Sequence, residues 1–366
     1  MLTGNKGDWS EIYALFKLIA DGTMQKGDNN LLPAPGETYK IISLTKQEKA
    51  AEAIYELDGN EVKISRGDRT EINTRAEFKT KATELLASIK QKRSEKDGAF
   101  AIPAIETFMN EILTHSIKAG SGDKTDLSVK ILDHRTTQEH MRGFSIKSQL
   151  GGKSTLLNAS KTNTWFRYKI DGKEAEEALN VNDIKTGAKI QLRVKALEKL
   201  QGEGKLTVSE LGPVSDCFQH NLTIIDDALP AVISSLLWNG YRLGKMKLCE
   251  ILPFISEHNP RGYAFNDLDT IYSKKIKQLL VSSALGMMPA TVWDGEYQTT
   301  GGYLVVLRSG EVVSYHFYDR QEFETYLFKH TALESPSSKR HEYALVKRDD
   351  DGSLYFDLCL QIRFYH

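Results

Sequence analysis

The spacing of hydrophobic residues changes along the chain and predicts a mixture of helices and strands. Apolar side chains recur every three or four positions in residues 8–20, which predicts an amphipathic helix. Residues 39–44 and 53–57 have the pattern of strands, and Asp58-Gly59 after the second one is typical of a hairpin turn. The same criteria predict a loop at 25–36, helices at 74–93, 102–118, 228–238, 241–254 and 268–285, and strands at 61–65, 125–132, 143–148, 303–308, 312–317 and 355–364.

This order of elements predicts an α/β fold with a central mixed sheet flanked by helices. The 366 residues correspond to about two domains, at roughly 150 residues each. Residues 165–170 fit either a strand or a short helix, and residues 171–215 are charged and mostly helical in pattern. We therefore expect a first domain over 1–210 and a C-terminal helix-then-strand region over 211–366.

Charge and cysteine content exclude several classes of protein. Lys and Arg number 48 against 49 Asp and Glu, so the chain is not a uniformly basic nucleic-acid coat, although a local basic cleft is compatible with this balance. No run of residues approaches the 18 apolar positions of a membrane span. The N-terminus lacks a secretory signal, and three widely spaced cysteines argue against a disulfide framework or a zinc ribbon.

The strongest candidate for chemistry is the pair Asp126 and Lys147. Asp126 begins one predicted strand, and Lys147 lies in the next with Ser145 on the same strand face, because strand side chains alternate with a period of two. On adjacent antiparallel strands, these side chains can reach one end of a sheet. A carboxylate that holds Mg²⁺ beside a cation is what phosphodiester hydrolysis requires. A charged strand face without chemistry is the alternative interpretation.

Two other motifs are weaker. Glu11 lies at the edge of the apolar face of the first helix, where it is either a second metal-binding carboxylate or an ordinary surface residue. Gly152-Lys153-Ser154 resembles the end of a phosphate-binding loop, but that motif needs a glycine five positions earlier, where Lys147 stands. The sequence therefore does not predict an NTPase.

Two segments are rich in the hydroxyl, amide and cationic groups that contact DNA phosphates and base edges. The first contains Asn158, Ser160, Lys161, Thr162 and Asn163, a few residues after Lys147. The second is 335–341, with Ser337, Ser338, Arg340 and His341. Arg340 is a natural candidate for a bidentate contact with guanine. A solvated loop has a similar composition.

Three blocks of sequence resemble the HpaII family of type II restriction endonucleases. They are GNKGDWSEIY at 4–13, GFSIKS at 143–148 with STLLNAS at 154–160, and SPSS at 335–338 with Arg340-His341 and LCLQIRF at 358–364. The blocks extend from one end of the chain to the other, and the middle one is the most specific.

This resemblance implies a nuclease of the PD-(D/E)xK superfamily that depends on Mg²⁺. Thr125-Asp126 then corresponds to the P-D position, with Asp126 as a metal ligand, and Lys147 to the lysine. Ser145 stands where the pattern has Asp or Glu, so another group must complete the metal shell, because a serine hydroxyl is a poor Mg²⁺ ligand. Glu11 is the first candidate, Gln149 the second, and Asp133 a further possibility if the strand register differs.

The resemblance further implies a cytoplasmic bacterial enzyme that cuts double-stranded DNA at a short palindrome, with CCGG as the expected target. Gln361 and Arg363 join the expected DNA contacts. A palindromic site favours a homodimer, and a restriction enzyme needs a methyltransferase encoded nearby to protect the host DNA. The rival hypothesis is a DNA-binding protein on an inactive nuclease fold, in which Ser145 marks lost metal binding.

Overall fold

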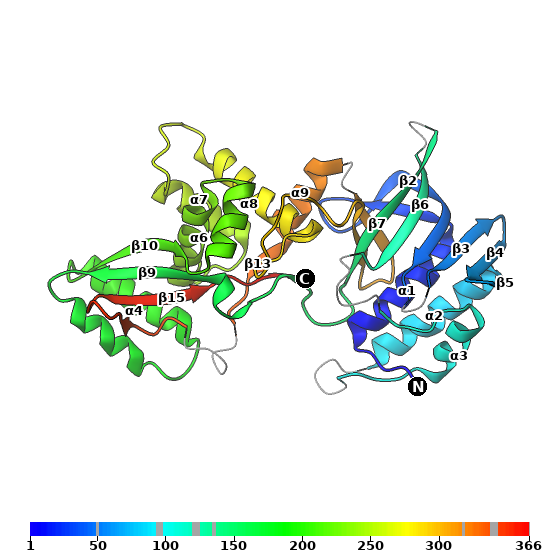
Figure 1. Cartoon of the computed structure of the whole chain (residues 1–366), viewed down its shortest axis with the longest axis horizontal. Coiled ribbons are helices and arrows are strands. Elements are labelled where there is room, and N and C mark those ends of the chain that lie inside the picture. The colour runs from blue at the N-terminus through cyan, green and yellow to red at the C-terminus, as the bar shows by residue number, and fades with distance from the viewer. Residues whose placement is uncertain are drawn as a thin grey trace. The chain divides into compact units, whose positions relative to one another are not determined.

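The computed structural model describes residues 1–48, 51–92, 98–118, 125–133, 137–316, 319–336 and 343–365 (Figure 1). They form a mixed α/β structure, as the sequence predicts. Two compact units are present. The first comprises Met1–Ser154 with Tyr297–Tyr326, and the second comprises Thr155–Glu296 with Leu327–Tyr365.

The expected division at residue 210 is therefore wrong. Strand β9 (Trp165–Asp171) pairs with β15 (Leu354–Cys359), so it belongs with the end of the chain. Strand β11 (Gly302–Val306) instead pairs in parallel with β7 (Gln138–Ser148) of the first unit. Both pairings join segments more than 150 residues apart, and a local hydrophobic pattern carries no information about such partners.

The first unit contains a nine-stranded mixed sheet in the order β1-β12-β11-β7-β6-β2-β3-β4-β5. Because β1 also pairs with β2, the pairings among β1, β12, β11, β7, β6 and β2 form a closed circuit. The remaining strands of the sheet are β1 (Thr23–Gly27), β2 (Pro33–Lys46), β3 (Ala53–Asp58), β4 (Glu61–Arg66), β5 (Arg69–Thr74), β6 (Leu127–Asp133) and β12 (Val312–His316).

Most of the loop expected at 25–36 is strand. Gln25 pairs in parallel with Val313 of β12, and Pro33 pairs with Gly27. The turn is confined to the residues between β1 and β2, where Asp28 accepts hydrogen bonds from the backbone of Asn30 and Leu32. The Gly, Asn and Pro content indicated the turn. The residues before it are a strand because they pair with β12 near residue 313, which a local pattern does not reveal.

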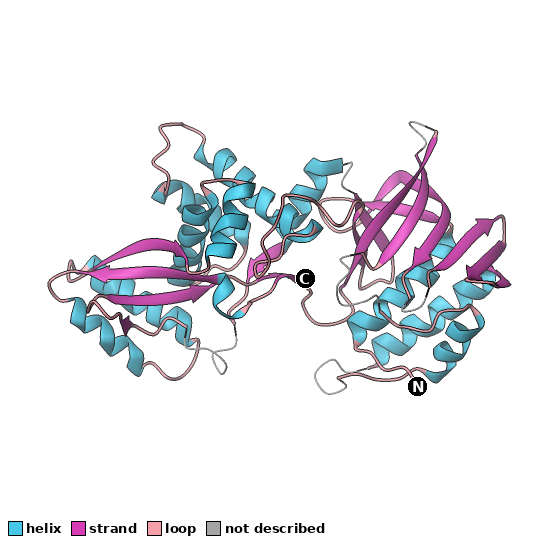
Figure 2. Cartoon of the chain, viewed as in Figure 1, coloured by secondary structure: helices cyan, strands magenta, loops and turns pink. Residues whose placement is uncertain are grey.

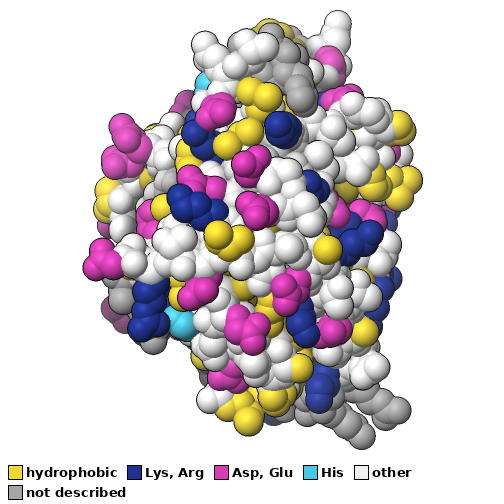
Figure 3. All heavy atoms as spheres, turned by 90° about the vertical axis from the view of Figure 1, so that its right-hand side faces the viewer, with side chains coloured by type: hydrophobic (Ala, Val, Ile, Leu, Met, Phe, Trp, Pro, Cys, Tyr) yellow, Lys and Arg dark blue, Asp and Glu magenta, His cyan; other side chains and the backbone are white. Residues whose placement is uncertain are grey.

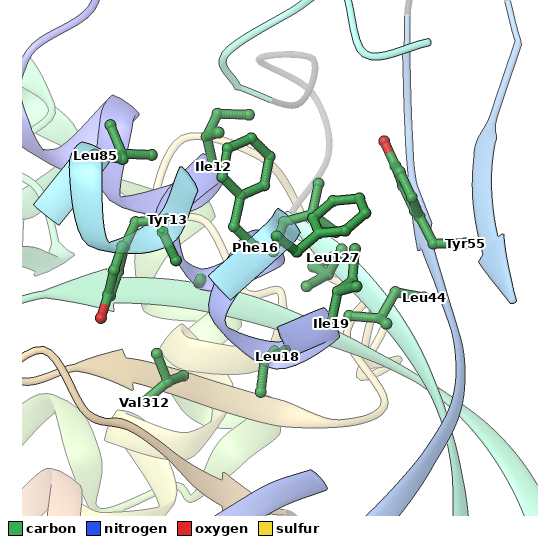
Figure 4. Close-up of a cluster of buried hydrophobic side chains, with 14 of the residues drawn as sticks. Ile12, Tyr13, Phe16, Leu18, Ile19, Leu44, Tyr55, Leu85, Leu127 and Val312 are labelled. Atoms are coloured by element: carbon green, nitrogen blue, oxygen red, sulfur yellow. The ribbon is translucent and has the colours of Figure 1, made fainter. Parts of the chain in front are cut away.

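Helix α1 (Lys6–Asp21) confirms the helix predicted at 8–20 and supplies one side of the core (Figure 4). Asn5 caps it, since the Asn5 side chain accepts from the backbone N–H of Asp8. Phe16 packs edge-on against Phe78 of α2 (Arg75–Gln91) and Phe108 of α3 (Pro103–Glu111), with ring centroids 5.7 and 5.4 Å away. These helices cover one side of the sheet in Figure 2.

Helix α3 ends earlier than the expected 118. Leu113 takes a left-handed φ of 58°, and the Thr114 N–H donates to Met109, which closes the helix. The Thr114 hydroxyl is then hydrogen-bonded to Tyr55 of β3. This tertiary contact outweighs the helical spacing of the apolar residues that follow.

The two faces of the β7–β11–β12 segment meet different helices. One face, here called the α1 face, contributes Phe144, Ile146, Leu304, Val306 and Val312 to the core around α1. The opposite face, here called the α9 face, carries Ser145, Lys147, Tyr303, Val305 and Tyr315, by strand alternation and cross-strand register. Helix α9 (Arg320–His330) covers part of it, because its Phe323 packs on Tyr303 and its Tyr326 stacks on Tyr315.

The second unit holds a four-stranded sheet, β10-β9-β15-β14, and a three-stranded sheet, β13-β16-β8. Tyr168 of β9 and Phe356 of β15 stack at 4.9 Å, and Trp238 packs beside both rings. Its further elements are β8 (Thr155–Leu157), β10 (Thr207–Pro213), β13 (Thr331–Leu333), β14 (Lys347–Arg348), β16 (Ile362–Phe364), the 3-10 helices η1 (Lys161–Thr164) and η2 (Ala175–Asp183), and the helices α4 (Lys189–Gly202), α5 (Asp216–Ile225), α6 (Leu229–Leu243), α7 (Leu248–His258) and α8 (Leu268–Leu285).

Several boundaries in this unit differ from those predicted. Residues 165–170 form a strand, and β10 interrupts the mostly helical pattern expected over 171–215. Helix α6 runs on to Leu243 and ends at Gly244, whose φ is 70°. The terminal strand expected at 355–364 is split into β15 and β16, which belong to different sheets.

The surface is electrically mixed on the face drawn in Figure 3, where Lys and Arg side chains are interspersed with Asp and Glu. This distribution matches the overall net charge of -1. Among the helices that the structure describes, none is long and apolar enough to cross a membrane.

Candidate functional site

Asp126, Ser145 and Lys147 meet on the α9 face, as the strand pattern predicts. The Ser145 hydroxyl donates to Asp126 Oδ2 at 3.0 Å, and Lys147 Nζ donates to the same hydroxyl at 3.0 Å. The Ile146 N–H also donates to Asp126 Oδ2 at 2.6 Å. A carboxylate, a hydroxyl and an ammonium group are therefore joined in one hydrogen-bonded row, here called the Asp–Ser–Lys row.

Backbone pairing between β6 and β7 positions this row. Leu127 pairs with Phe144 in antiparallel register, and the Asp126 N–H donates to the Phe144 carbonyl at 2.9 Å. Gly143 allows the approach, since a Cβ at that position would lie 2.6 Å from Thr125 Oγ1. The expected adjacency of the two strands is confirmed.

Tyr303 is a site residue that the sequence did not reveal. It pairs in register with Ser145, and its ring lies 4.9 Å from Lys147 Nζ, measured to the centroid. Burial, together with the negative charge of Asp126, raises the pKa of the Tyr303 hydroxyl far above its ordinary value. Its strand was predicted, but nothing local indicated that this strand is the neighbour of β7.

The donor set fits Mg²⁺ in part. Asp126 is half-buried, and its Oδ1 accepts no hydrogen bond from the described residues, so that oxygen is available to bind a ligand. No group of three or more His, Cys, Asp or Glu suited to a metal occurs in the described part of the chain. Magnesium sites in phosphoryl-transfer enzymes use one or two carboxylates with substrate oxygens and water, so a single strand carboxylate is compatible with such a site.

Glu11 lies on α1, which packs against the other side of β7. The neighbouring Ser10 hydroxyl lies 2.8 Å from the Ser148 hydroxyl, one residue beyond Lys147. Glu11 is half-buried, and its Oε2 atom is shielded from solvent. Its role as a second metal ligand stays a prediction.

The two other candidate ligands lie elsewhere. The Gln149 amide oxygen accepts from the backbone N–H of Arg308 at 3.2 Å, at the end of β11. Asp133 is the last residue of β6, about 23 Å along the strand from Asp126 at 3.3 Å per residue. Strand geometry therefore excludes Asp133 from the Asp–Ser–Lys row, and Gln149 is engaged with the backbone.

Three predicted DNA contacts come together in the second unit. Strand β8 pairs with β16, which brings Asn158 close to the β15–β16 junction. The side-chain amides of Asn158 and Gln361 lie 3.2 Å apart. When the Gln361 oxygen faces Arg363, it accepts from the guanidinium at 3.2 and 3.3 Å. These amide and guanidinium groups, the kinds that can contact base edges, thus form one cluster, here called the Asn–Gln–Arg cluster.

The other predicted DNA contacts divide into two groups. Lys161 and Thr162 are exposed in η1, whereas Ser160 and Asn163 are half-buried and support local structure. The side-chain amide of Asn163 donates a hydrogen bond to the Ser160 hydroxyl, and its oxygen accepts one from the hydroxyl of Ser215, the N-cap residue of α5. Ser337, Ser338, Arg340 and His341 lie outside the described residues.

A second feature that the sequence did not reveal is a cavity of about 400 Å³ between β10, α4, α6 and α7. Glu210 lines it, with His258 Nε2 at 3.7 Å from its Oε1, and burial raises the pKa of Glu210 to about 8. Burial and the nearby Arg242 lower the pKa of His258.

Comparison with known proteins gives a consistent result. The sequence profile described as HpaII restriction endonuclease matches residues 5–364. The type II restriction enzyme HpaII of Haemophilus parainfluenzae is 38% identical over 99% of this chain and 98% of its own length. No solved structure matches the chain.

Proposed function

The chain belongs to the HpaII restriction endonuclease family, and we propose that it cleaves double-stranded DNA at CCGG by Mg²⁺-dependent hydrolysis. Membership in this family makes it a type II site-specific deoxyribonuclease. The target sequence, the metal and the role of each residue are parts of the proposal. We further propose a PD-(D/E)xK core with Ser145 at the acidic position, in a cytoplasmic bacterial enzyme.

The Asp–Ser–Lys row carries this proposal. Asp126 and Lys147 occupy the positions that the superfamily pattern assigns to the metal-binding acid and the lysine. The Ser145 hydroxyl lies 3.0 Å from Asp126 Oδ2 and 3.0 Å from Lys147 Nζ. A serine at the position of the second acid therefore keeps a polar link between the two residues. In an inactive nuclease fold, nothing would require a lysine to be linked to an aspartate through a single hydroxyl group.

Each residue of the row has a defined task in the proposed reaction. Asp126 Oδ1 would hold Mg²⁺, with Glu11 as the proposed second ligand. The bound metal supplies a lowered pKa for the attacking water and charge neutralisation at the phosphate. Ser145 and the Ile146 N–H fix the Asp126 carboxylate by binding its other oxygen. Lys147 stabilises the negative charge that develops on the phosphate oxygens.

Base reading is proposed for the Asn–Gln–Arg cluster. Arg363 has the bidentate geometry that recognises guanine, and Asn158 and Gln361 supply amide groups for a neighbouring base. Exposed Lys161 and Thr162 would contact phosphates. Arg340, His341, Ser337 and Ser338 are retained as proposed contacts from the sequence alone. A palindromic target favours a homodimer and requires a methyltransferase encoded nearby.

Digestion of unmethylated phage DNA tests this function. The purified full-length protein is incubated with Mg²⁺ or EDTA, alongside Asp126→Asn, and the products are separated on a gel. Discrete fragments that appear only with Mg²⁺ and wild-type protein support the proposal, and the fragment sizes test CCGG. Intact DNA with a retained mobility shift would instead support a DNA-binding protein without catalysis.

A further inference from the structure

The ammonium group of Lys147 is held from two directions. Its Nζ donates to Ser145 Oγ at 3.0 Å, and it lies over the ring of Tyr303 at 4.9 Å from the centroid. Ser145 belongs to the same strand as Lys147, whereas Tyr303 comes from β11, more than 150 residues later. A lysine side chain has four rotatable bonds, so a second contact restricts its position considerably.

The Tyr303 ring is itself immobilised. It is 2% exposed and lies in the middle of three paired strands, opposite Ser145 on β7 and Tyr315 on β12. Phe323 of α9 packs edge-on against it, with centroids 5.5 Å apart and an interplanar angle of 88°. The ring therefore presents a fixed face to the lysine.

An aromatic face attracts a cation, and the attraction strengthens where water is excluded. On α9, which covers the same face, Glu322 pairs with Lys26 and Glu324 with Arg320. The carboxylate of Asp126 is joined to the lysine by hydrogen bonds through Ser145.

We propose that Tyr303 is a positioning residue of the nuclease, whose ring face holds the ammonium group of Lys147 in place. This inference rests on the proposed function, because it assigns to Tyr303 the support of the lysine that acts on the phosphate. The ring and not the hydroxyl carries the role. The neutral hydroxyl, with its strongly raised pKa, is unsuited to act as a base.

Two substitutions separate the ring from the hydroxyl. Tyr303→Phe keeps the aromatic face, whereas Tyr303→Leu removes it and keeps an apolar side chain. Tyr315→Leu is the matched control, because Tyr315 is an equally buried tyrosine on the next strand whose ring stacks on Tyr326. Single-turnover cleavage of unmethylated CCGG duplex and DNA affinity in EDTA are measured for each full-length protein.

The expected result is a loss confined to Tyr303→Leu. Its cleavage rate should fall about three- to thirty-fold, the range that a cation–π contact supports, with unchanged DNA affinity. Tyr303→Phe should lie within about threefold of wild type.

A direct readout of the lysine is independent of cleavage. Acetic anhydride reacts with a lysine amine that is free to move into contact with it, so the rate of Lys147 labelling at one fixed pH, followed by peptide mass spectrometry, reports how firmly the amine is held. We expect faster labelling in Tyr303→Leu and the wild-type rate in Tyr303→Phe and Tyr315→Leu. If wild-type protein does not cut DNA, the proposed function fails while this labelling rate still tests the contact.

Three results would overturn the inference. The first is wild-type cleavage and a wild-type rate of Lys147 labelling in Tyr303→Leu. The second is an equal loss in Tyr303→Phe, which would assign the effect to the hydroxyl. The third is an equal loss in Tyr315→Leu, which would assign it to packing of the sheet.

Discussion

The hydroxyl of Ser145 lies 3.0 Å from Asp126 Oδ2, at the position where the proposed PD-(D/E)xK pattern has a second acid. Ser145 is 7% exposed, so the contact is largely removed from solvent. A carboxylate at this position would stand directly against another carboxylate, and Lys147 could compensate the charge of one of them alone. The serine instead donates a hydrogen bond to Asp126 and adds no charge to the row.

Replacement of Ser145 by Asp should make folding dependent on Mg²⁺. In EDTA, we expect the two adjacent carboxylates to lower stability by about 1–3 kcal/mol, because a buried charge is left uncompensated. Added Mg²⁺ should restore the stability, because it binds the folded state only. At a Mg²⁺ concentration a hundred times its dissociation constant, this stabilisation is about 2.7 kcal/mol. Thermal unfolding with and without Mg²⁺ measures both effects. Ser145→Asn, which adds no charge, should respond to Mg²⁺ as wild type does, and an equal response of the Asp variant would contradict the prediction.

Replacement of Asp126 by Asn should abolish cleavage and spare DNA binding. The amide retains an acceptor for Ser145 and Ile146, so we expect the fold to persist. Loss of the metal-binding charge should reduce the single-turnover rate more than about 100-fold. Asp133→Asn is the control from the far end of the same strand and should cut normally. Normal cutting by Asp126→Asn, or loss of cutting by Asp133→Asn, would place the metal ligand elsewhere.

Replacement of Arg363 by Ala should relax sequence discrimination. A bidentate contact with guanine contributes about 1–3 kcal/mol against the wrong base, so the rate ratio between the cognate site and a single-substituted site should fall by roughly that amount. Competition cleavage of the two duplexes measures the ratio. As a control, Arg348→Ala removes an exposed arginine that pairs with Glu176. This variant should leave the rate ratio unchanged. Uniform weakening at all sites, with the salt slope reduced by about 1, would show that Arg363 binds phosphate instead.

Replacement of Glu210 by Gln should remove a pH-dependent loss of stability. Burial raises the pKa of this carboxyl to about 8, so the folded state binds the proton more tightly than the unfolded chain does. Wild-type stability should therefore fall as pH rises from about 4.5 through 8, by up to roughly 4 kcal/mol, while the Gln variant does not share this loss. Urea unfolding at several pH values measures the difference. Glu257→Gln, an exposed neighbour of His258, should follow wild type, and parallel curves for Glu210→Gln would show that Glu210 is ionised in the folded protein.

Local pattern was sufficient for some parts of this molecule. The hairpin at Asp58-Gly59, the first helix and the adjacency of Asp126 to Lys147 follow from turn chemistry and side-chain alternation, which act over a few residues. Tyr303, the strand that holds it and the cavity around Glu210 depend on pairings between distant segments. The same cause explains the wrong boundary at 210, because no composition change marks the points at which the chain leaves one unit and returns to it.

The return of residues 297–326 to the first sheet has a consequence during protein synthesis. Strand β7 leaves the ribosome with Asp126 and Lys147 already made, but its partner β11 follows only about 150 residues later. Until then, β7 has an uncovered edge, and the lysine lacks the ring beside it. An interrupted translation product therefore contains the residues proposed for catalysis without the strand that supports them. We expect nuclease activity to begin only when nearly the whole polypeptide has emerged.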